Sequence, residues 1–187
     1  MEIEILDHRG ISEAQAREIA ELIVAIWPRP GRTVETRTAD ILGQWQNYDG
    51  PETEYPRSFL IRDNGRIIAH AQADPRTIRT SDGDLKTLAL CRVCTDPSVR
   101  GKNLGRAVVE AAFELVDNGT FPFSLFQTKD AVRPFYEKLG AMLTTNRYYN
   151  SKAENPDADP FWDPCIMRYP SDGDWPSGDI DINGPGW

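Results

Sequence analysis

The sequence has 187 residues, of which 40% are apolar, and this is enough for one domain with a buried core. Its formal net charge of -8 argues against a nucleic-acid partner, because phosphate binding needs a basic surface. No export signal or membrane-spanning run of roughly 18 apolar residues is found, so we expect a cytoplasmic protein without a membrane partner.

The first part of the chain predicts one strand and two helices. Residues 1–6 alternate polar and apolar side chains, as a half-buried strand does. Ser12 and Gln15 have the spacing of a capping box, and they should begin a helix that ends at Pro28. A second, shorter helix is expected over residues 41–48.

Strands come next. Residues 58–62 and 66–73 predict two strands joined by a hairpin turn at 63–65. After a further turn at 80–84, residues 85–95 form a long, nearly continuous apolar strand, which is typical of the centre of a sheet. This strand holds Cys91 and Cys94. We expect them to be buried, reduced thiols and not a metal or redox pair, because positions three apart on a strand point to opposite faces.

The remaining elements alternate between helix and strand. Residues 105–116 carry a helical apolar stripe, and 121–126 predict a short strand. A short helix over 130–139 should end at Gly140, and 141–149 should be a further strand. This order predicts an α/β (α+β) fold in which helices pack on a mixed sheet.

The segment from residue 154 differs in composition, because it is rich in proline, glycine and aspartate. Only 165–169 resembles a strand there. We therefore predict a single domain over 1–153, with residues 154–187 packed on its surface. The acidic residues of this segment favour a cationic partner, although a solvated acidic surface explains them equally well.

A basic, glycine-containing loop lies between the strand 85–95 and the helix that follows it. Such a loop can direct backbone N–H groups, helped by the positive end of the helix, at the phosphates of a ligand. Glycines let the backbone approach closely, and the basic side chains add charge. The candidate residues are Arg100, Gly101, Lys102, Asn103, Leu104, Gly105 and Arg106.

Residues 100–105, Arg-Gly-Lys-Asn-Leu-Gly, resemble the Gln/Arg-x-x-Gly-x-Gly/Ala signature of GCN5-related N-acetyltransferases. Asn103 stands where the family usually has glycine, and asparagine is the other residue that best tolerates left-handed backbone geometry. About 30 residues later, 132–141 (Val-Arg-Pro-Phe-Tyr-Glu-Lys-Leu-Gly-Ala) is similar to a second family motif, Phe-Tyr-Glu-Lys-Leu-Gly-Phe.

The resemblance implies the acyl-CoA N-acyltransferase fold, with a mostly antiparallel sheet, one splayed strand pair and helices on both faces. It implies acetyl-CoA as co-substrate, with no metal, and a small-molecule amine as acceptor. By the same resemblance, Val93, Cys94 and Thr95 bind the pantetheine arm, Lys129 contacts coenzyme A, and Tyr136 protonates the departing thiolate. For Tyr136, packing or a hydrogen bond to coenzyme A is the alternative.

The sequence leaves the general base and the acceptor open. Cys91 and Arg92 stand where relatives often have a glutamate base, so a carboxylate elsewhere or water must act. The carboxylates considered are Asp82, Asp84, Glu52, Glu54 and the aspartates of the 154–187 segment.

The family binds its acceptor with the first two helices and the C-terminal segment, which are rich in aromatic residues here. The side chains in question are Trp27, Arg29, Trp45, Tyr48, Tyr55, Phe161, Trp162 and Trp175. The last four residues, Gly-Pro-Gly-Trp, resemble the ending of aminoglycoside 2'-N-acetyltransferases, so an aminoglycoside acceptor is one alternative. A coenzyme A binding module without turnover is another, and a homodimer stays open.

Overall fold

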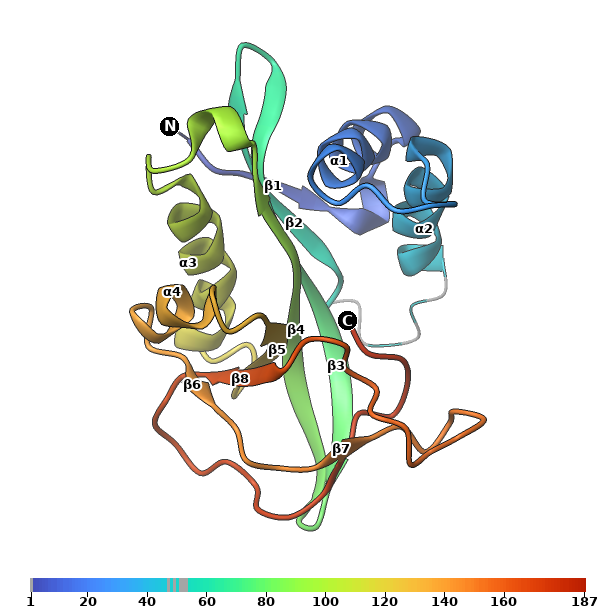
Figure 1. Cartoon of the computed structure of the whole chain (residues 1–187), viewed down its shortest axis with the longest axis vertical. Helices are drawn as coiled ribbons and strands as arrows, with labels where there is room; N and C mark the ends of the chain where they lie inside the picture. Colours follow the sequence, from blue (N-terminus) through green and yellow to red (C-terminus); the bar gives the residue numbers. More distant parts are fainter. Residues whose placement is uncertain (1, 47, 49, 51–53) are drawn as a thin grey trace. The chain divides into compact units, whose positions relative to one another are not determined.

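The computed structural model describes residues 2–46, 48, 50 and 54–187, and it consists of two compact units. The first unit comprises Met1–Asp74 and Arg92–Ala112, and the second comprises Pro75–Cys91 and Phe113–Trp187. Three long elements contribute residues to both units. They are strands β3 (Arg66–Thr80) and β4 (Gly83–Thr95) and helix α3 (Leu104–Asp117) (Figure 1).

In the first unit, strand β1 (Glu4–Asp7) pairs antiparallel with β2 (Arg57–Asp63), which pairs antiparallel with β3. The predicted hairpin turn is confirmed, because Asn64 and Gly65 both have positive φ, at 49° and 80°. Beyond the turn, β3 is longer than the sequence predicted. It continues past Pro75, which ends the apolar run, as far as Thr80.

Two helices of this unit lie side by side, α1 (Glu13–Ile26) and α2 (Val34–Gln46), preceded by the 3-10 turn η1 (His8–Gly10) (Figure 1). The capping box of α1 is confirmed, since Ser12 Oγ accepts from the Gln15 amide at 3.2 Å and Gln15 Oε1 accepts from the Ser12 amide at 2.9 Å. Helix α2 begins at Val34, earlier than predicted, because Thr33 Oγ1 accepts from the Thr36 amide and caps the first turn.

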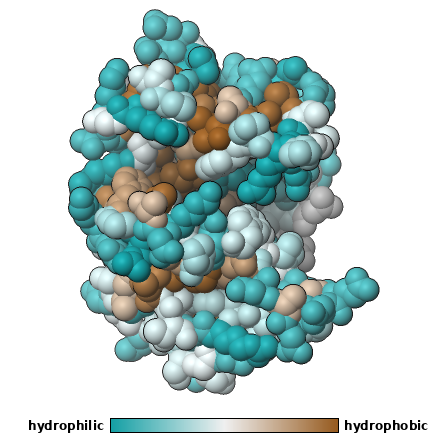
Figure 2. All heavy atoms as spheres, viewed as in Figure 1, coloured by the Kyte–Doolittle hydropathy of each residue, from teal (hydrophilic) through white to brown (hydrophobic). Residues whose placement is uncertain are grey.

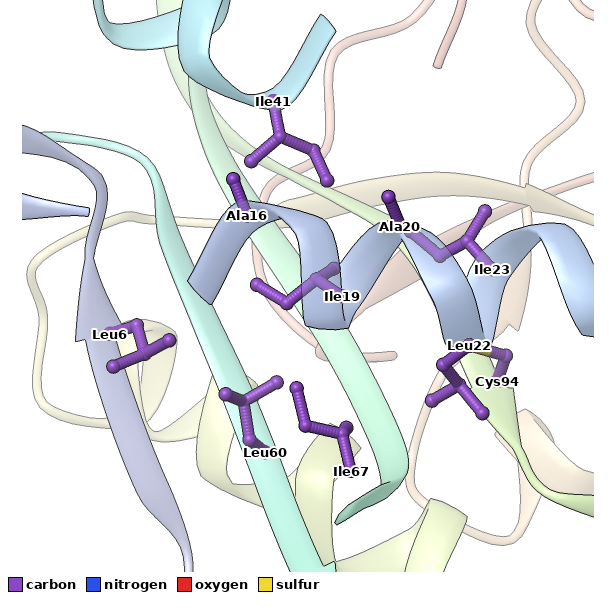
Figure 3. Packing of buried hydrophobic residues seen from close by; sticks show 10 residues of the cluster. All are labelled: Leu6, Ala16, Ile19, Ala20, Leu22, Ile23, Ile41, Leu60, Ile67 and Cys94. Atoms are coloured by element: carbon purple, nitrogen blue, oxygen red, sulfur yellow. The ribbon is translucent and has the colours of Figure 1, made fainter. Parts of the chain in front are cut away.

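The core of the first unit forms where α1 covers the strands. Figure 3 shows the apolar side chains of α1 lying against those of the strands and of α2. The buried members of this cluster are Leu6, Ala16, Ile19, Ala20, Leu22, Ile23, Ile41, Leu60, Ile67 and Cys94. Burial of such side chains is worth roughly 1.5–3 kcal/mol for each large residue, so this cluster fixes α1 on the strands.

In the second unit, β4 pairs in parallel with β5 (Ser124–Thr128), but the register holds only at Leu88–Ser124 and Ala89–Leu125. All five residues of β5 pair antiparallel with β8 (Cys165–Tyr169) on its other edge. The two parallel strands therefore separate after Ala89, which confirms the expected splayed strand pair.

The predicted strand over 141–149 is wrong in one respect, because the segment contains two short strands with different partners. Strand β6 (Met142–Leu143) pairs with β8, and β7 (Tyr148–Tyr149) pairs with β9 (Ile180–Asp181), a strand that the sequence did not predict. Between them, the side-chain amide of Asn146 donates to the carbonyls of Pro176 and Gly178. Alternation of apolar residues indicates extended backbone, but it does not specify the partner strand.

Residues from 154 onward belong to the second unit and contribute to its core. Phe161, Ile180 and Ile182 are buried together with Ile78 and Leu125. The indole N–H of Trp187 donates to the Leu125 carbonyl at 2.8 Å.

Hydrophilic residues account for most of the atoms on the face of the molecule that Figure 2 shows, with smaller apolar patches among them. Within the described residues, none of the helices combines the length and the apolar character needed to cross a membrane.

Candidate functional site

The basic loop of the first unit starts at a well-ordered turn. The Asp96 carboxylate accepts from the amide and the hydroxyl of Ser98, at 2.9 and 2.7 Å, and pairs with Arg66 at 3.0 Å. These hydrogen bonds lower the pKa of Asp96, which therefore stays ionised. The turn continues as the 3-10 helix η2 (Pro97–Val99).

The backbone of the loop then takes the left-handed conformation at two positions, Gly101 with φ 81° and Asn103 with φ 60°. The prediction that asparagine can replace glycine in this turn is thereby confirmed. Residues 100–103 precede helix α3, and its first hydrogen bond runs from the Ala107 amide to the Asn103 carbonyl at 3.0 Å.

The amides of Leu104, Gly105 and Arg106 have no acceptor within the described part of the chain. They are the first N–H groups of a 14-residue helix, where the partial positive charge of the helix is concentrated. An anion placed there would satisfy several donors at once. This arrangement fits a diphosphate group.

Gly105 has a separate role, which is to allow α3 to start close to β4. A Cβ atom at Gly105 would lie 3.1 Å from Thr95 Oγ1, tighter than most side-chain contacts. Gly101, in contrast, faces open space, and its φ of 81° is the reason for glycine there.

The charged side chains of the loop differ in their partners. Arg100 and Lys102 are exposed, and Arg100 contributes to the low pKa of Asp96. Arg106 is also exposed, and its guanidinium pairs with Glu110 at 2.8 Å. Leu104 is buried, with 6% of its surface exposed, and it anchors the start of α3.

The strand residues before the loop are partly enclosed. Val93 and Thr95 are half-buried, whereas the Cys94 side chain is in the core and burial raises the pKa of its thiol to about 12. Cys94 is buried, as predicted, whereas Cys91 is only half-buried. Among the residues that the structure describes, no three His, Cys, Asp or Glu side chains are grouped as metal ligands.

Tyr136 lies in the second unit, in helix α4 (Arg133–Glu137), which is shorter than the predicted helix. Only 5% of its surface is exposed, and its ring packs against Phe126 and Phe135 with centroid distances of 4.6 and 4.9 Å. Lys129 is exposed at the turn before α4, and its carbonyl accepts from the Arg133 amide at 3.0 Å. Gly140 follows α4 with φ 87°, as predicted.

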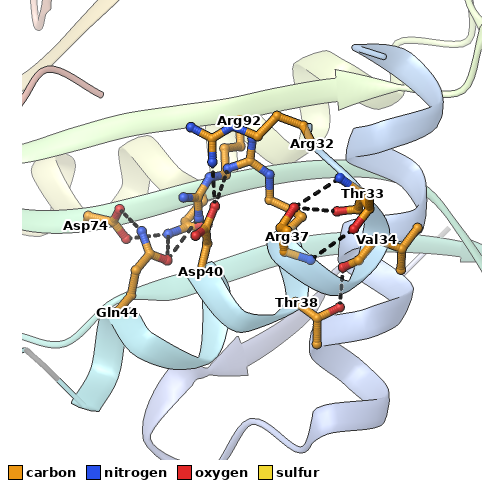
Figure 4. Close-up of polar contacts among 11 residues, drawn as sticks. Arg32, Thr33, Val34, Arg37, Thr38, Asp40, Gln44, Asp74 and Arg92 are labelled. Atoms are coloured by element: carbon orange, nitrogen blue, oxygen red, sulfur yellow. Dashed lines mark hydrogen bonds and ion pairs between the residues drawn. The ribbon is translucent and has the colours of Figure 1, made fainter. Parts of the chain in front are cut away.

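Sequence reasoning missed a polar network between α2 and strands β3 and β4 of the first unit (Figure 4). Arg92 Nη1 donates to Gln44 Oε1 and Gln72 Oε1, at 2.9 and 2.6 Å. The amides of both glutamines donate to the Asp74 carboxylate, at 3.2 and 2.7 Å. A signal was present, because His70, Gln72 and Asp74 form a polar stripe at two-residue spacing in the first half of β3, where the other residues after Arg66 are apolar.

A second buried chain of hydrogen bonds ends at the backbone of Arg92. His70 Nδ1 lies 2.8 Å from the Arg92 carbonyl, which can only accept, so Nδ1 carries the proton. His70 Nε2 then accepts from Ser58 Oγ at 3.0 Å, and Ser58 Oγ accepts from His8 Nε2 at 2.9 Å. Burial lowers the pKa of His70 to about 3, so the ring is neutral.

The side chains expected to bind the acceptor have varied environments. Trp27 and Trp162 are 40% and 61% exposed, whereas Phe161 is buried in the second core. The Trp175 indole donates to Asn146, and Arg9 stacks 3.6 Å from the centroid of the Tyr55 ring.

Of the carboxylates considered as general base, Asp82 is exposed in the turn between β3 and β4, and Asp84 is exposed near the start of β4. Asp84 lies 3.8 Å from Arg79. Glu52 lies outside the described residues. The backbone carbonyl of Glu54 accepts a hydrogen bond from the Tyr48 hydroxyl.

Comparison with known proteins agrees with this geometry. Residues 17–141 match the model of the Acetyltransferase (GNAT) family, a range that includes the loop and Tyr136. No curated protein sequence matches the chain.

Solved structures of this fold resemble the chain at low identity. The GNAT family N-acetyltransferase YhbS of Escherichia coli, solved with CoA, has a TM-score of 0.64 at 13% identity, with 97% of this chain and 88% of that one covered. Glucosamine-6-phosphate N-acetyltransferase of Arabidopsis thaliana gives 0.58 at 18% identity, over 83% and 100%. A probable N-acyltransferase of Enterococcus faecalis V583 gives 0.58 at 13% identity, and the match covers 77% of this chain but 33% of that protein.

Proposed function

The chain belongs to the acetyltransferase (GNAT) family, and from this premise we propose that it transfers an acetyl group from acetyl-CoA to the primary amine of a small molecule. The reaction proposed is direct attack in a ternary complex, without an acetylated enzyme.

One observation carries the proposal for the co-substrate. The amides of residues 104–106 lack acceptors within the described chain, and two left-handed residues precede them in a loop that bears Arg100 and Lys102. This combination suits the diphosphate of coenzyme A. The structure of YhbS with CoA supports the choice of ligand through the shared fold.

The chemistry asked of the protein is modest, because a thioester is already activated toward amines and positioning supplies much of the rate. A backbone N–H among Val93–Thr95 would stabilise the negative charge that develops on the thioester oxygen. The new N–C bond forms as the C–S bond breaks. The ammonium proton passes to a carboxylate or to water, and Tyr136 would protonate the departing sulfur.

The proposal is tested by calorimetry with acetyl-CoA and by thiol release with a panel of amines. The panel contains amino acids, amino sugars, polyamines, aminoglycosides and peptide N-termini. We expect saturable binding of acetyl-CoA and thiol release with at least one class of amine. If acetyl-CoA binds and no amine releases thiol, the chain is a coenzyme A binding module, and the proposed activity is wrong.

Replacing Tyr136 tests its role as the proton donor. In Tyr136→Phe we expect kcat to fall by roughly 100-fold with little change in the Kd of acetyl-CoA, because the ring still packs but the proton is lost. The matched control is Tyr148→Phe, which removes the hydrogen bond to Thr144 at 2.7 Å in the same unit and should retain kcat. Equal kcat in the wild type and Tyr136→Phe would assign the ring to packing.

A further inference from the structure

A cluster of arginines lies on helix α2, on the loop before it and on strand β4 of the first unit, although the chain is acidic as a whole. Helix α2 is one of the elements with which the family is expected to bind its acceptor. Arg32 and Arg37 both pair with one oxygen of Asp40, at 3.0 and 3.3 Å. Arg29 lies on the same turn as Arg32, joined to it by a backbone hydrogen bond of 3.0 Å. We call Arg29, Arg32, Arg37 and Arg92 the arginine cluster.

The charges of this cluster act on one another. Burial lowers the pKa of Arg37, and the positive charges of Arg92, Arg32 and Arg29 lower it further, whereas Asp40 raises it. Four positive charges and the two negative charges of Asp40 and Asp74 leave a net charge of +2. Such a concentration of like charge is unfavourable unless an anion compensates it.

Several donors of the cluster are unused. Arg37 Nε is buried and has no hydrogen-bond partner within the described chain. Arg92 donates through Nη1 to two glutamines, but no carboxylate among the described residues pairs with Arg92 or Arg29. A purely structural set of arginines would be expected to pair each buried donor, because an unmet one costs free energy.

Arg92 is also held in place by its backbone. Its φ is 52°, which is unusual for a residue other than glycine within a strand, and its carbonyl is fixed by His70. A strained backbone that is fixed by surrounding groups is typical of functional sites. The position matters because Arg92 directly precedes Val93, where the bound pantetheine arm is proposed to lie.

We propose that the arginine cluster binds a carboxylate or phosphate group of the acceptor, so that the substrate is a small amine that also carries an anionic group. This inference rests on the proposed acetyltransferase function and deepens it. A guanidinium is suited to this task, since its planar set of N–H donors matches carboxylate and phosphate oxygens.

The proposal replaces the cationic acceptor that the acidic residues of the C-terminal segment favoured. Three acids of that segment have partners in the second unit. Asp157 and Asp179 pair with Arg147, at 2.8 and 3.1 Å, and the buried Asp181 accepts from the amides of Ser151 and Asn183.

The experiment compares amines that differ only in the anionic group. O-phosphorylethanolamine is paired with ethanolamine, and lysine with 1,5-diaminopentane, so that one pair tests phosphate and the other carboxylate. We expect thiol release with a lower KM for the anionic member of at least one pair. In Arg37→Gln and Arg92→Gln, that KM should rise roughly tenfold to a hundredfold, with no change in the Kd of acetyl-CoA.

Two further variants serve as controls. Arg17→Gln removes an arginine that pairs with Glu21 and Glu35 on the exposed side of α1, and it should leave KM unchanged. Arg37→Lys keeps the charge and should retain part of the preference for the anionic amine. Equal KM values within each pair, or a preference for the neutral or cationic amine that Arg37→Gln leaves unaltered, would overturn the inference.

A binding measurement separates this inference from the proposed function. With saturating CoA in the diphosphate loop, inorganic phosphate should raise the thermal midpoint of the wild type further, but not that of Arg37→Gln. This shift tests the arginine cluster even if no amine is acetylated. If CoA does not bind, the shift is measured without CoA. The same comparison with acetate tests a carboxylate site. A midpoint that neither anion raises, or that each anion raises equally in the wild type and Arg37→Gln, would exclude an anion site there.

Discussion

The two histidines of the chain are buried in one hydrogen-bonded series that supports the Arg92 carbonyl. The His70 ring must be neutral in it, because His70 donates through Nδ1 and accepts through Nε2. His8 Nε2 donates to Ser58, and His8 Nδ1 has no partner within the described residues. This series links the first turn of the chain to the left-handed residue in β4.

The neutral histidines predict a pH dependence of stability. Burial lowers the pKa of His70 from 6.5 to about 3, and burial also lowers that of His8. Below pH 6.5 the unfolded chain therefore binds protons that the native protein does not. The stabilisation is complete above pH 6.5 and is lost progressively as the pH falls toward 3.

Between pH 7 and pH 5, we expect the free energy of unfolding to fall by about 2 kcal/mol from His70 alone. Urea unfolding at pH 5, 6 and 7 measures it. His70→Gln keeps polar atoms at the site and should reduce the pH dependence. Stability that is independent of pH over this range would show that the rings are not held neutral.

At the scale of elements, the loop between β4 and α3 combines a 3-10 turn, two left-handed residues and a helix start. Asn64 and Asn183 share the left-handed conformation of Asn103, and Asn64, with φ 49°, lies in the turn between β2 and β3. Asn64 and Asn103 have the same backbone requirement in different places. They therefore form a matched pair for separating ligand binding from folding.

We predict that Asn103→Val weakens acetyl-CoA binding roughly tenfold, because a β-branched residue in left-handed geometry costs about 1–2 kcal/mol or distorts the loop. Asn103→Gly should bind at least as well as the wild type. Calorimetry gives the Kd values.

Asn64→Val is the control for this experiment. Its free energy of unfolding should fall by about as much as that of Asn103→Val, and its Kd for acetyl-CoA should equal that of the wild type. A weakened Kd in both valine variants would mean that general destabilisation is responsible.

At the scale of the whole molecule, the C-terminal segment contributes to the core of the second unit although its composition is that of a surface loop. Ile180 and Ile182 are fully buried beside Ile78 and Phe161. Apolar residues spaced among prolines and aspartates thus complete a core whose other buried residues come from β3, β5 and β7.

Ile180→Ala should therefore lower the free energy of unfolding by about 2–4 kcal/mol, through lost apolar burial and the cavity that remains. Asp174→Ala, at an exposed position of the same segment, should change it by less than about 0.5 kcal/mol. Chemical denaturation compares the two. Equal, small effects would show that the segment does not stabilise the fold.

Local signals determined much of the fold. The capping box of α1, the Asn-Gly turn, the long strand β4 and the loop with left-handed residues at Gly101 and Asn103 all depend on neighbours within a few positions. Such features are predictable because their energetics are local. The family motif at 100–105 could likewise be recognised from residues that are neighbours in the sequence.

Only the tertiary structure decided which distant residues meet. The division of 141–149 into two strands, the pairing of β9 with β3 and β7, and the hydrogen bond between Arg92 and Gln44 depend on packing between elements far apart in the sequence. Arg92 appeared in the sequence only as a residue that could not be a base. Its conformation and partners follow from contacts with β3 and α2, which a one-dimensional pattern does not contain.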